Sequence, residues 1–113
     1  MGQFKEQSII DESTEHATLP PELRAVITIM AADPELVRKA LPHVDIDHQN
    51  INWEEIYAND FSGGHSAALT FARAIWSDKV ETKSDPFSYA FNMDTRLQSA
   101  VLRALAIRWG LVA

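Results

Sequence analysis

The sequence predicts an all-α protein, a compact orthogonal bundle of five or six helices around two central apolar helices at about residues 63–77 and 95–109. Apolar residues recur in several segments at the three- and four-residue spacing of an α-helix. Most of these segments begin with an Asp, Asn or Ser that can cap a helix. No segment alternates apolar and polar residues for long enough to require a strand, because the β-prone pieces at 44–51 and 80–82 are short.

Length and composition indicate one globular unit. The chain has 113 residues, 46% of them hydrophobic, which suits a single domain with a core. The absence of cysteine excludes disulfide frameworks, cysteine nucleophiles and thiolate metal sites. Residues 1–18 are mostly polar. We expect them to form a flexible N-terminal arm and residues 19–113 to form a single helical domain.

The charge is unevenly distributed. Residues 1–60 contain 12 acidic and 4 basic residues, whereas residues 61–113 contain 4 acidic and 6 basic residues. The acidic first half is either a solvated surface or a face that attracts a basic partner. The net charge of −6 disfavours nucleic-acid binding, and no apolar run reaches the roughly 18 residues of a membrane span. Without an export signal, we expect a cytoplasmic protein that binds neither nucleic acid nor membrane.

Two short helices are predicted first. Pro20–Pro21 suits the first turn of a helix that ends near Ala32, because proline lacks the amide hydrogen that would be unpaired there. Its apolar side has helical spacing and consists of Leu23, Val26, Ile27 and Met30. Asp33–Pro34 begins the second helix in the same way, and Pro42 ends it.

The central part of the chain contains a polar connection and two helices. After residues 42–51, Asn52 is placed to cap a short helix, with Glu55 three residues later as in a capping box. Ser62 is placed to cap the helix at 63–77, which is apolar over most of its circumference. A helix of that kind is packed on several sides, so we expect it at the centre of the fold.

The last third predicts a loop and two helices. Residues 78–84 form a surface loop, and Asp85–Pro86 begins a short aromatic-rich helix. Asp94 is placed to cap the helix at 95–109, and Gly110 suits the left-handed position that ends it. The broad apolar face of this helix consists of Leu97, Val101, Leu102, Ala104, Leu105 and Trp109, and its exposed strip of Arg96, Ser99 and Arg103.

The turn Ser62-Gly63-Gly64-His65 is the candidate ligand site. Glycines at the start of a helix leave backbone N–H groups open to an anion. His65 projects toward the apolar side of its helix, where it could bind or protonate a ligand near pH 7. Alternatively, the glycines allow close helix packing and His65 is a half-buried histidine with its hydrogen bonds satisfied.

Other groups of polar residues give weaker indications of metal binding, catalysis or nucleic-acid binding. His43, Asp45, Asp47 and His48 could bind a divalent metal, but their spacing matches no helical ligand pair and no calcium loop. Ser62 and His65 lie near Asp60 in sequence without the G-x-S-x-G elbow of a serine hydrolase. The arginine strip of the last helix is too narrow for nucleic-acid recognition. We therefore assign no catalytic residue, no metal and no cofactor.

Aromatic residues provide the strongest functional signal. They either seal the ends of the bundle or anchor a protein interface, and the interface candidates are Trp53, Tyr57, Phe87, Tyr89 and Phe91. The leading hypothesis is a small, non-catalytic helical module that binds a protein partner or a second copy of itself. It predicts that Phe87→Ala or Tyr89→Ala weakens association more than folding. The alternative is a protein that binds a small ligand, anion or metal, with or without catalysis, at the Ser62–His65 turn.

Overall fold

The fold is that of a computed structural model, which describes residues 19–79 and 86–112. The expected arm at 1–18, the β-prone piece at 80–82 and the Asp85 cap lie outside the described residues. The elements in chain order are α3 (Pro21–Met30), α4 (Pro34–Lys39), η1 (Leu41–His43), β1 (Val44–Asp45), β2 (Asn50–Ile51), α5 (Trp53–Tyr57), α6 (Gly63–Ser77), η2 (Pro86–Asn92) and α7 (Thr95–Arg108). The predicted compact, mostly α-helical bundle is confirmed.

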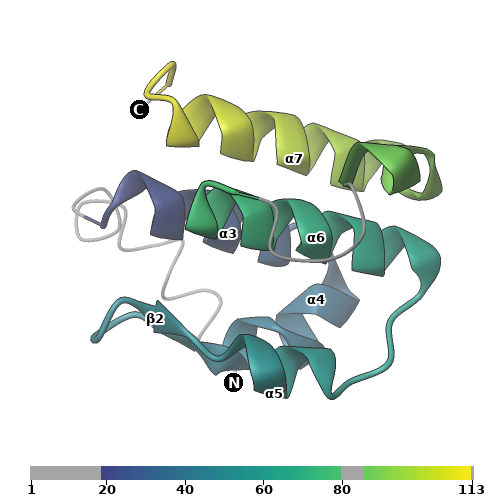
Figure 1. Cartoon of the computed structure of the whole chain (residues 1–113), viewed down its shortest axis with the longest axis horizontal. Helices are drawn as coiled ribbons and strands as arrows, with labels where there is room; N and C mark the ends of the chain where they lie inside the picture. The colour runs from purple at the N-terminus through teal and green to yellow at the C-terminus, as the bar shows by residue number, and fades with distance from the viewer. Residues whose placement is uncertain (1–18, 80–85, 113) are drawn as a thin grey trace.

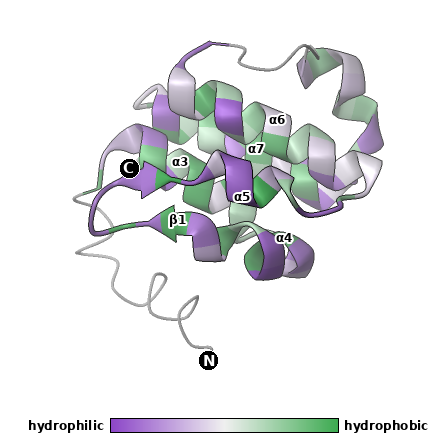
Figure 2. Ribbon diagram, turned by 60° about the horizontal axis from the view of Figure 1, so that its bottom comes forward, coloured by the Kyte–Doolittle hydropathy of each residue, from purple (hydrophilic) through white to green (hydrophobic). Residues whose placement is uncertain are grey.

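The helices are arranged in layers (Figure 1). Helix α7 forms the upper layer, α3 and α6 lie beneath it, and α4, α5 and the two strands form the lower layer. Helix α3 packs against both α6 and α7 and buries six of its ten residues. In Figure 2, apolar residues are abundant in the stack of α3, α6 and α7, and polar residues on α5 and its adjoining loops face the viewer. No helix of residues 19–79 and 86–112 is long and apolar enough to cross a membrane.

The sequence predicts α7 at the centre of the bundle, but only one side of this helix packs against the core. Its buried residues lie along the side that faces α3 and α6, and they are Leu97, Ala100, Val101, Ala104 and Ile107. The opposite side is open, because Leu102 and Trp109 are exposed. The apolar character of this helix is thus divided between a core side and an outer side.

The predicted helix N-caps are confirmed wherever the structure describes them. Each capping side chain accepts a hydrogen bond from a backbone N–H in the first turn, which would otherwise lack a partner. The bonds are Asp33 to Glu35 N–H at 2.9 Å, Asn52 to Glu55 N–H at 3.2 Å, Ser62 to His65 N–H at 3.4 Å and Asp94 to Leu97 N–H at 2.9 Å. These local interactions set the start of α4, α5, α6 and α7.

The end of α7 is a Schellman motif. Gly110 has φ of +74°, in the left-handed region predicted for it. Its N–H donates to the Ile107 carbonyl at 3.1 Å, and the Leu111 N–H donates to the Ala106 carbonyl at 2.8 Å. These two bonds satisfy carbonyls that the helix leaves unpaired. The motif fixes the path of the chain just after α7.

The polar connection at 42–51 contains a small hairpin that the sequence analysis did not predict. Strands β1 and β2 are antiparallel, with Val44 opposite Ile51 and Asp45 opposite Asn50. Each strand has two residues, so there is no run of alternation to detect. The hairpin falls within the 44–51 stretch, one of the two β-prone pieces of the sequence.

Candidate functional site

Exposed large apolar side chains are concentrated in the last part of the chain. Of the eight in the described residues, seven lie between residues 86 and 112. They are Phe87, Tyr89 and Phe91 in η2, Leu102 in α7, Trp109 at the C-cap of α7, and Leu111 and Val112 just after it. We call these seven side chains the η2–α7 face. These side chains are distributed along the length of α7, from η2 at its start to the residues after its end (Figure 1), and exposed apolar surface of this kind makes the segment a candidate interaction site.

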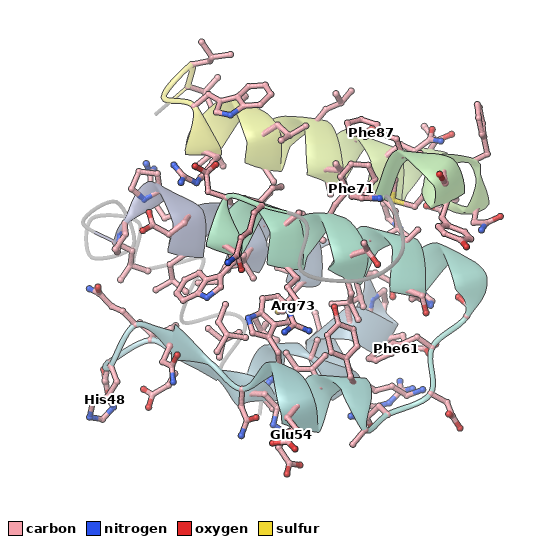
Figure 3. All side chains as sticks on the ribbon, viewed as in Figure 1. His48, Glu54, Phe61, Phe71, Arg73 and Phe87 are labelled. Atoms are coloured by element: carbon pink, nitrogen blue, oxygen red, sulfur yellow. The ribbon has the colours of Figure 1, made fainter. Side chains whose placement is uncertain are left out.

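The α7 part of the face lies opposite the core. Leu102 and Trp109 are 69% and 65% exposed, and they are two helical turns apart on the same side of α7. At 1.5 Å per residue, their backbones are about 10 Å apart along the helix axis. Figure 3 shows side chains of α7 extending from its outer side, where no other described element lies. These two side chains therefore project into solvent from a helix whose inner side is fixed in the core.

The η2 part of the face is anchored to the bundle. The Phe87 ring meets the Phe71 ring of α6 edge-on, with their centroids 5.3 Å apart (Figure 3). Gln98 Nε2 of α7 donates to the Ala90 carbonyl of η2 at 3.3 Å. In Figure 1, η2 lies at the end where α7 begins. Phe91 is 93% exposed, and it projects from η2, a segment that is held by contacts with α6 and α7.

The charges around the face are mainly positive. Helix α7 contains three arginines and no acidic residue, and Asp94 is the only acid between residues 86 and 112. Arg103 is exposed, next to Leu102 in sequence, and forms no ion pair with any residue that the structure describes. Of the first-half acids, Asp33 pairs with Arg96 of α7, whereas Glu54 lies on the side of the molecule away from α7 (Figure 3). The face therefore combines apolar and basic character.

Two of the five interface candidates belong to a different surface. Trp53 and Tyr57 of α5 stack with ring centroids 6.1 Å apart. Arg73 of α6 lies over both rings, 5.9 Å from the centroid of Trp53 and 5.5 Å from that of Tyr57. Burial of its ring raises the pKa of Tyr57 against the opposing effect of the Arg73 charge. This stack joins α5 to α6, so we assign both rings mainly to holding the fold together.

A buried carboxylate joins three helices. Asp33, which is 4% exposed, caps α4 through Oδ2, and the same oxygen lies 2.9 Å from His65 Nε2 of α6. Its Oδ1 accepts a hydrogen bond from Arg96 Nη2 of α7 at 2.7 Å. Burial alone would raise the pKa of Asp33, but the hydrogen bonds from His65 and from the backbone of α4 outweigh it, so the pKa is lowered. We call Asp33, His65 and Arg96 the Asp33 junction.

The junction engages both ring nitrogens of His65. Because the ionised Asp33 carboxylate can only accept, Nε2 carries the hydrogen that faces it. Nδ1 lies 2.8 Å from Ser62 Oγ, so the Ser62 hydroxyl can donate to it. The His65 side chain is 17% exposed. The structure thus brings Ser62 and His65 together, but with protein partners on both nitrogens, which favours the alternative of a satisfied histidine.

The two glycines of this turn lie against the end of η2. A Cβ added at Gly64 would lie 2.6 Å from the Asn92 carbonyl oxygen, a separation that is too short without movement of the backbone. At Gly63 the nearest atom, Asn92 Nδ2, would be 3.7 Å away, which is an ordinary contact. Gly64 therefore has a packing role. It lets α6 approach the segment that carries the exposed phenylalanines.

The histidines and acids of the hairpin do not form a metal site. His48 Nδ1 lies 2.8 Å from Asp45 Oδ2, and His48 is at the far end of the hairpin (Figure 3). Both side chains are well exposed. Within residues 19–79 and 86–112, no group of three or more potential ligands is placed to hold a metal ion. The His48–Asp45 pair is best explained as a local contact of the turn.

The sequence analysis assigned Leu102 and Trp109 to the apolar face of the last helix together with its core residues. A signal that separates the two groups is present in the sequence. At about 100° per residue, Leu102 and Trp109 lie about 120–160° around the helix from Leu97 and Ala104. Neither the protein families, nor the curated proteins, nor the solved structures with which the chain was compared match it. The function of this protein is therefore inferred from the geometry of the η2–α7 face and of the Asp33 junction.

Proposed function

We propose that this protein is a small, non-catalytic helical module that binds a protein partner through the η2–α7 face. The observation that carries the proposal is the gathering of seven of the eight exposed large apolar side chains in one stretch of 27 residues, 86–112. Burial of apolar surface on binding is favourable by about 25 cal/mol per Å². Trp, Tyr and Phe beside arginine are the residues that anchor protein interfaces.

The support behind the face favours binding. Phe87 rests on Phe71, Gln98 ties η2 to α7, and the Schellman motif fixes the chain after α7. A surface that is ordered before binding loses less conformational entropy when the partner arrives. By contrast, the Ser62–His65 turn offers no free ring nitrogen for chemistry. The binding hypothesis is therefore the better supported of the two that the sequence raised.

Phe91→Ala should weaken partner binding about tenfold or more, with little effect on folding. The ring is 93% exposed, so its removal costs the folded chain less than about 0.5 kcal/mol. Loss of an interface anchor typically costs 2 kcal/mol or more. Affinity capture from a lysate of the source cells, followed by quantitative mass spectrometry, measures the retained partner. Urea unfolding measures the stability of the same variant.

Tyr57→Ala is the matched control, because Tyr57 is the one exposed large aromatic of the described residues outside the face. It should retain the partner, provided that the variant is folded. Phe87→Ala is less informative, since it also removes the contact with Phe71. Full retention of every captured protein by Phe91→Ala and Trp109→Ala, with loss in Tyr57→Ala, would contradict the proposal.

A further inference from the structure

The outer side of α7 has the form of one half of a helix–helix contact. Leu102, Ala106 and Trp109 follow one another at spacings of four and three residues, which places them in a stripe along one side of the helix. The fourteen residues of α7 extend over about 21 Å. The apolar stripe itself occupies about 10 Å of this length, from Leu102 to Trp109, and offers ridges and grooves into which a second helix can pack.

Arginines border this stripe. On a helical wheel, Arg103 and Arg96 lie on the same edge, about 100–120° from Leu102, and Arg108 lies at a similar angle on the other edge. Arg96 is held by Asp33, and Arg108 donates to the Ile75 carbonyl at 3.2 Å. Both are also close to carboxylates that offset their charge, since Arg96 pairs with Asp33 and Arg108 Nη2 lies 3.8 Å from Asp78 Oδ1. Arg103 is exposed and not neutralised by any described side chain.

On this arrangement, and resting on the function proposed above, we infer that the partner of the η2–α7 face is an amphipathic helix whose apolar stripe is bordered by acidic residues. Its apolar side chains pack against Leu102 and Trp109. Its carboxylates face Arg103 and the exposed part of Arg96. Complementary charge at the rim accelerates association and rejects partners of the wrong sign.

The same charges disfavour a second copy of this chain as the partner. A twofold contact through the face would place one α7 against another, each with an Arg103 that has no carboxylate partner among the described residues. Like charges brought together in this way are destabilising. Docking of the face on the acidic first half of a second copy would join two different surfaces, and such contacts form open chains unless a ring closes. A partner that is a different, acidic chain can bind the face without like-charge repulsion and without forming open chains.

Two synthetic helical peptides test the inference on the full chain. They share one leucine stripe and differ only in the bordering residues, which are glutamates in one and lysines in the other. We expect the glutamate peptide to bind at least tenfold more tightly than the lysine peptide at about 0.05 M salt, with a smaller difference at about 0.5 M, because salt screens exposed charges. Fluorescence anisotropy of the labelled peptides gives the dissociation constants.

Substitutions at Arg103 and Leu102 separate the two contributions. Arg103→Glu should weaken binding of the glutamate peptide about fivefold and strengthen binding of the lysine peptide. Leu102→Ser should weaken binding of the glutamate peptide about tenfold. Arg38→Glu is the matched control, because Arg38 is an exposed arginine on α4, in the layer farthest from α7, and it should leave both affinities unchanged. Circular dichroism and urea unfolding confirm that each variant is folded.

The outcomes distinguish this inference from the proposed function. Equal binding of both peptides that is lost in Leu102→Ser would overturn the acidic partner and leave the interaction face in place. Self-association that is lost in Leu102→Ser, without binding of either peptide, would overturn it in favour of a second copy. Binding to anionic vesicles but to neither peptide would overturn the protein partner itself. Peptide binding that is unaffected by Leu102→Ser, Phe91→Ala and Arg103→Glu would remove the face from both proposals.

Discussion

Asp33→Ala is expected to lower the free energy of unfolding by about 3–5 kcal/mol. The side chain is almost completely buried and connects the cap of α4 with His65 of α6 and Arg96 of α7. Its removal leaves the partly buried His65 Nε2–H without an acceptor and breaks the bond from the half-exposed Arg96, and a hydrogen bond to a charged group contributes about 1.5–3 kcal/mol. Loss of the cap itself accounts for about 1 kcal/mol. Urea unfolding followed by circular dichroism measures the change.

Asp94→Ala measures the cost of losing a helix cap, so that this cost can be separated from the loss of the Asp33 junction. Asp94 caps α7 by a single bond to the Leu97 N–H and is exposed, so its loss should cost only about 1 kcal/mol. Asp33→Asn keeps a side chain that can cap α4 but removes the charge. The loss of stability in Asp33→Asn should therefore lie between the losses in Asp33→Ala and Asp94→Ala. Equal effects of Asp33→Ala and Asp94→Ala would show that the contacts with α6 and α7 contribute nothing measurable.

The junction also predicts how stability depends on pH. The folded protein lowers the pKa of Asp33 below its ordinary value of 3.8. The stabilisation from this ionised group is therefore fully present above the unfolded pKa, and it is lost as the pH falls through the folded pKa. The difference in stability between the wild type and Asp33→Asn should shrink as the pH falls below about 4.

Gly64→Ala is expected to destabilise the fold by about 1–3 kcal/mol. The added methyl group would lie 2.6 Å from the Asn92 carbonyl oxygen, and a backbone atom can move away only if η2 shifts as a unit. The adjacent Gly63→Ala provides the control, since its nearest neighbour is 3.7 Å away and alanine favours helices more than glycine does. Urea unfolding of both variants measures the difference. Similar stabilities would contradict a close contact between α6 and η2.

The effect of Gly64→Ala should extend to binding. A displaced η2 would move Phe91 relative to Leu102 and Trp109, so the partner would meet a face of altered shape. We therefore expect the variant to bind more weakly than Gly63→Ala under conditions in which both are folded. The Asp33 junction and the Gly64 contact both hold the start of α6 against the η2–α7 segment. The fold thus supports the proposed face at two places.

Local structure could be predicted from the sequence because its signals are local. The caps at Asp33, Ser62 and Asp94 each act within three residues, and the predicted helix 63–77 agrees with α6. The hairpin was not predicted, since two-residue strands carry no periodicity. The contact between Asp33 and Arg96 joins residues 63 positions apart, so nothing in the neighbourhood of either indicates the other.

The exposed apolar side chains of the proposed face were the harder part to predict, for a physical reason. A side chain that packs in a core and one that anchors a partner are both large and apolar. The sequence placed Leu102 and Trp109 on a broad apolar face, and only the packing of α7 on α3 and α6 shows that they point outward. For the η2 aromatics the sequence leaves two interpretations open, rings that seal the bundle or rings that anchor an interface, and the structure shows that Phe87, Tyr89 and Phe91 are exposed.

Hydroxyl-radical footprinting of the affinity-captured complex tests the proposed face most directly. Oxidation of each side chain, measured by mass spectrometry, is compared between the purified protein alone and the protein with its captured partner, normalised to the oxidation of an added reporter peptide. We predict that oxidation of Phe91, Leu102 and Trp109 falls severalfold in the complex while that of Tyr57 does not change. Unchanged oxidation of Phe91, Leu102 and Trp109, or protection centred on Tyr57, would contradict the η2–α7 face as the binding surface.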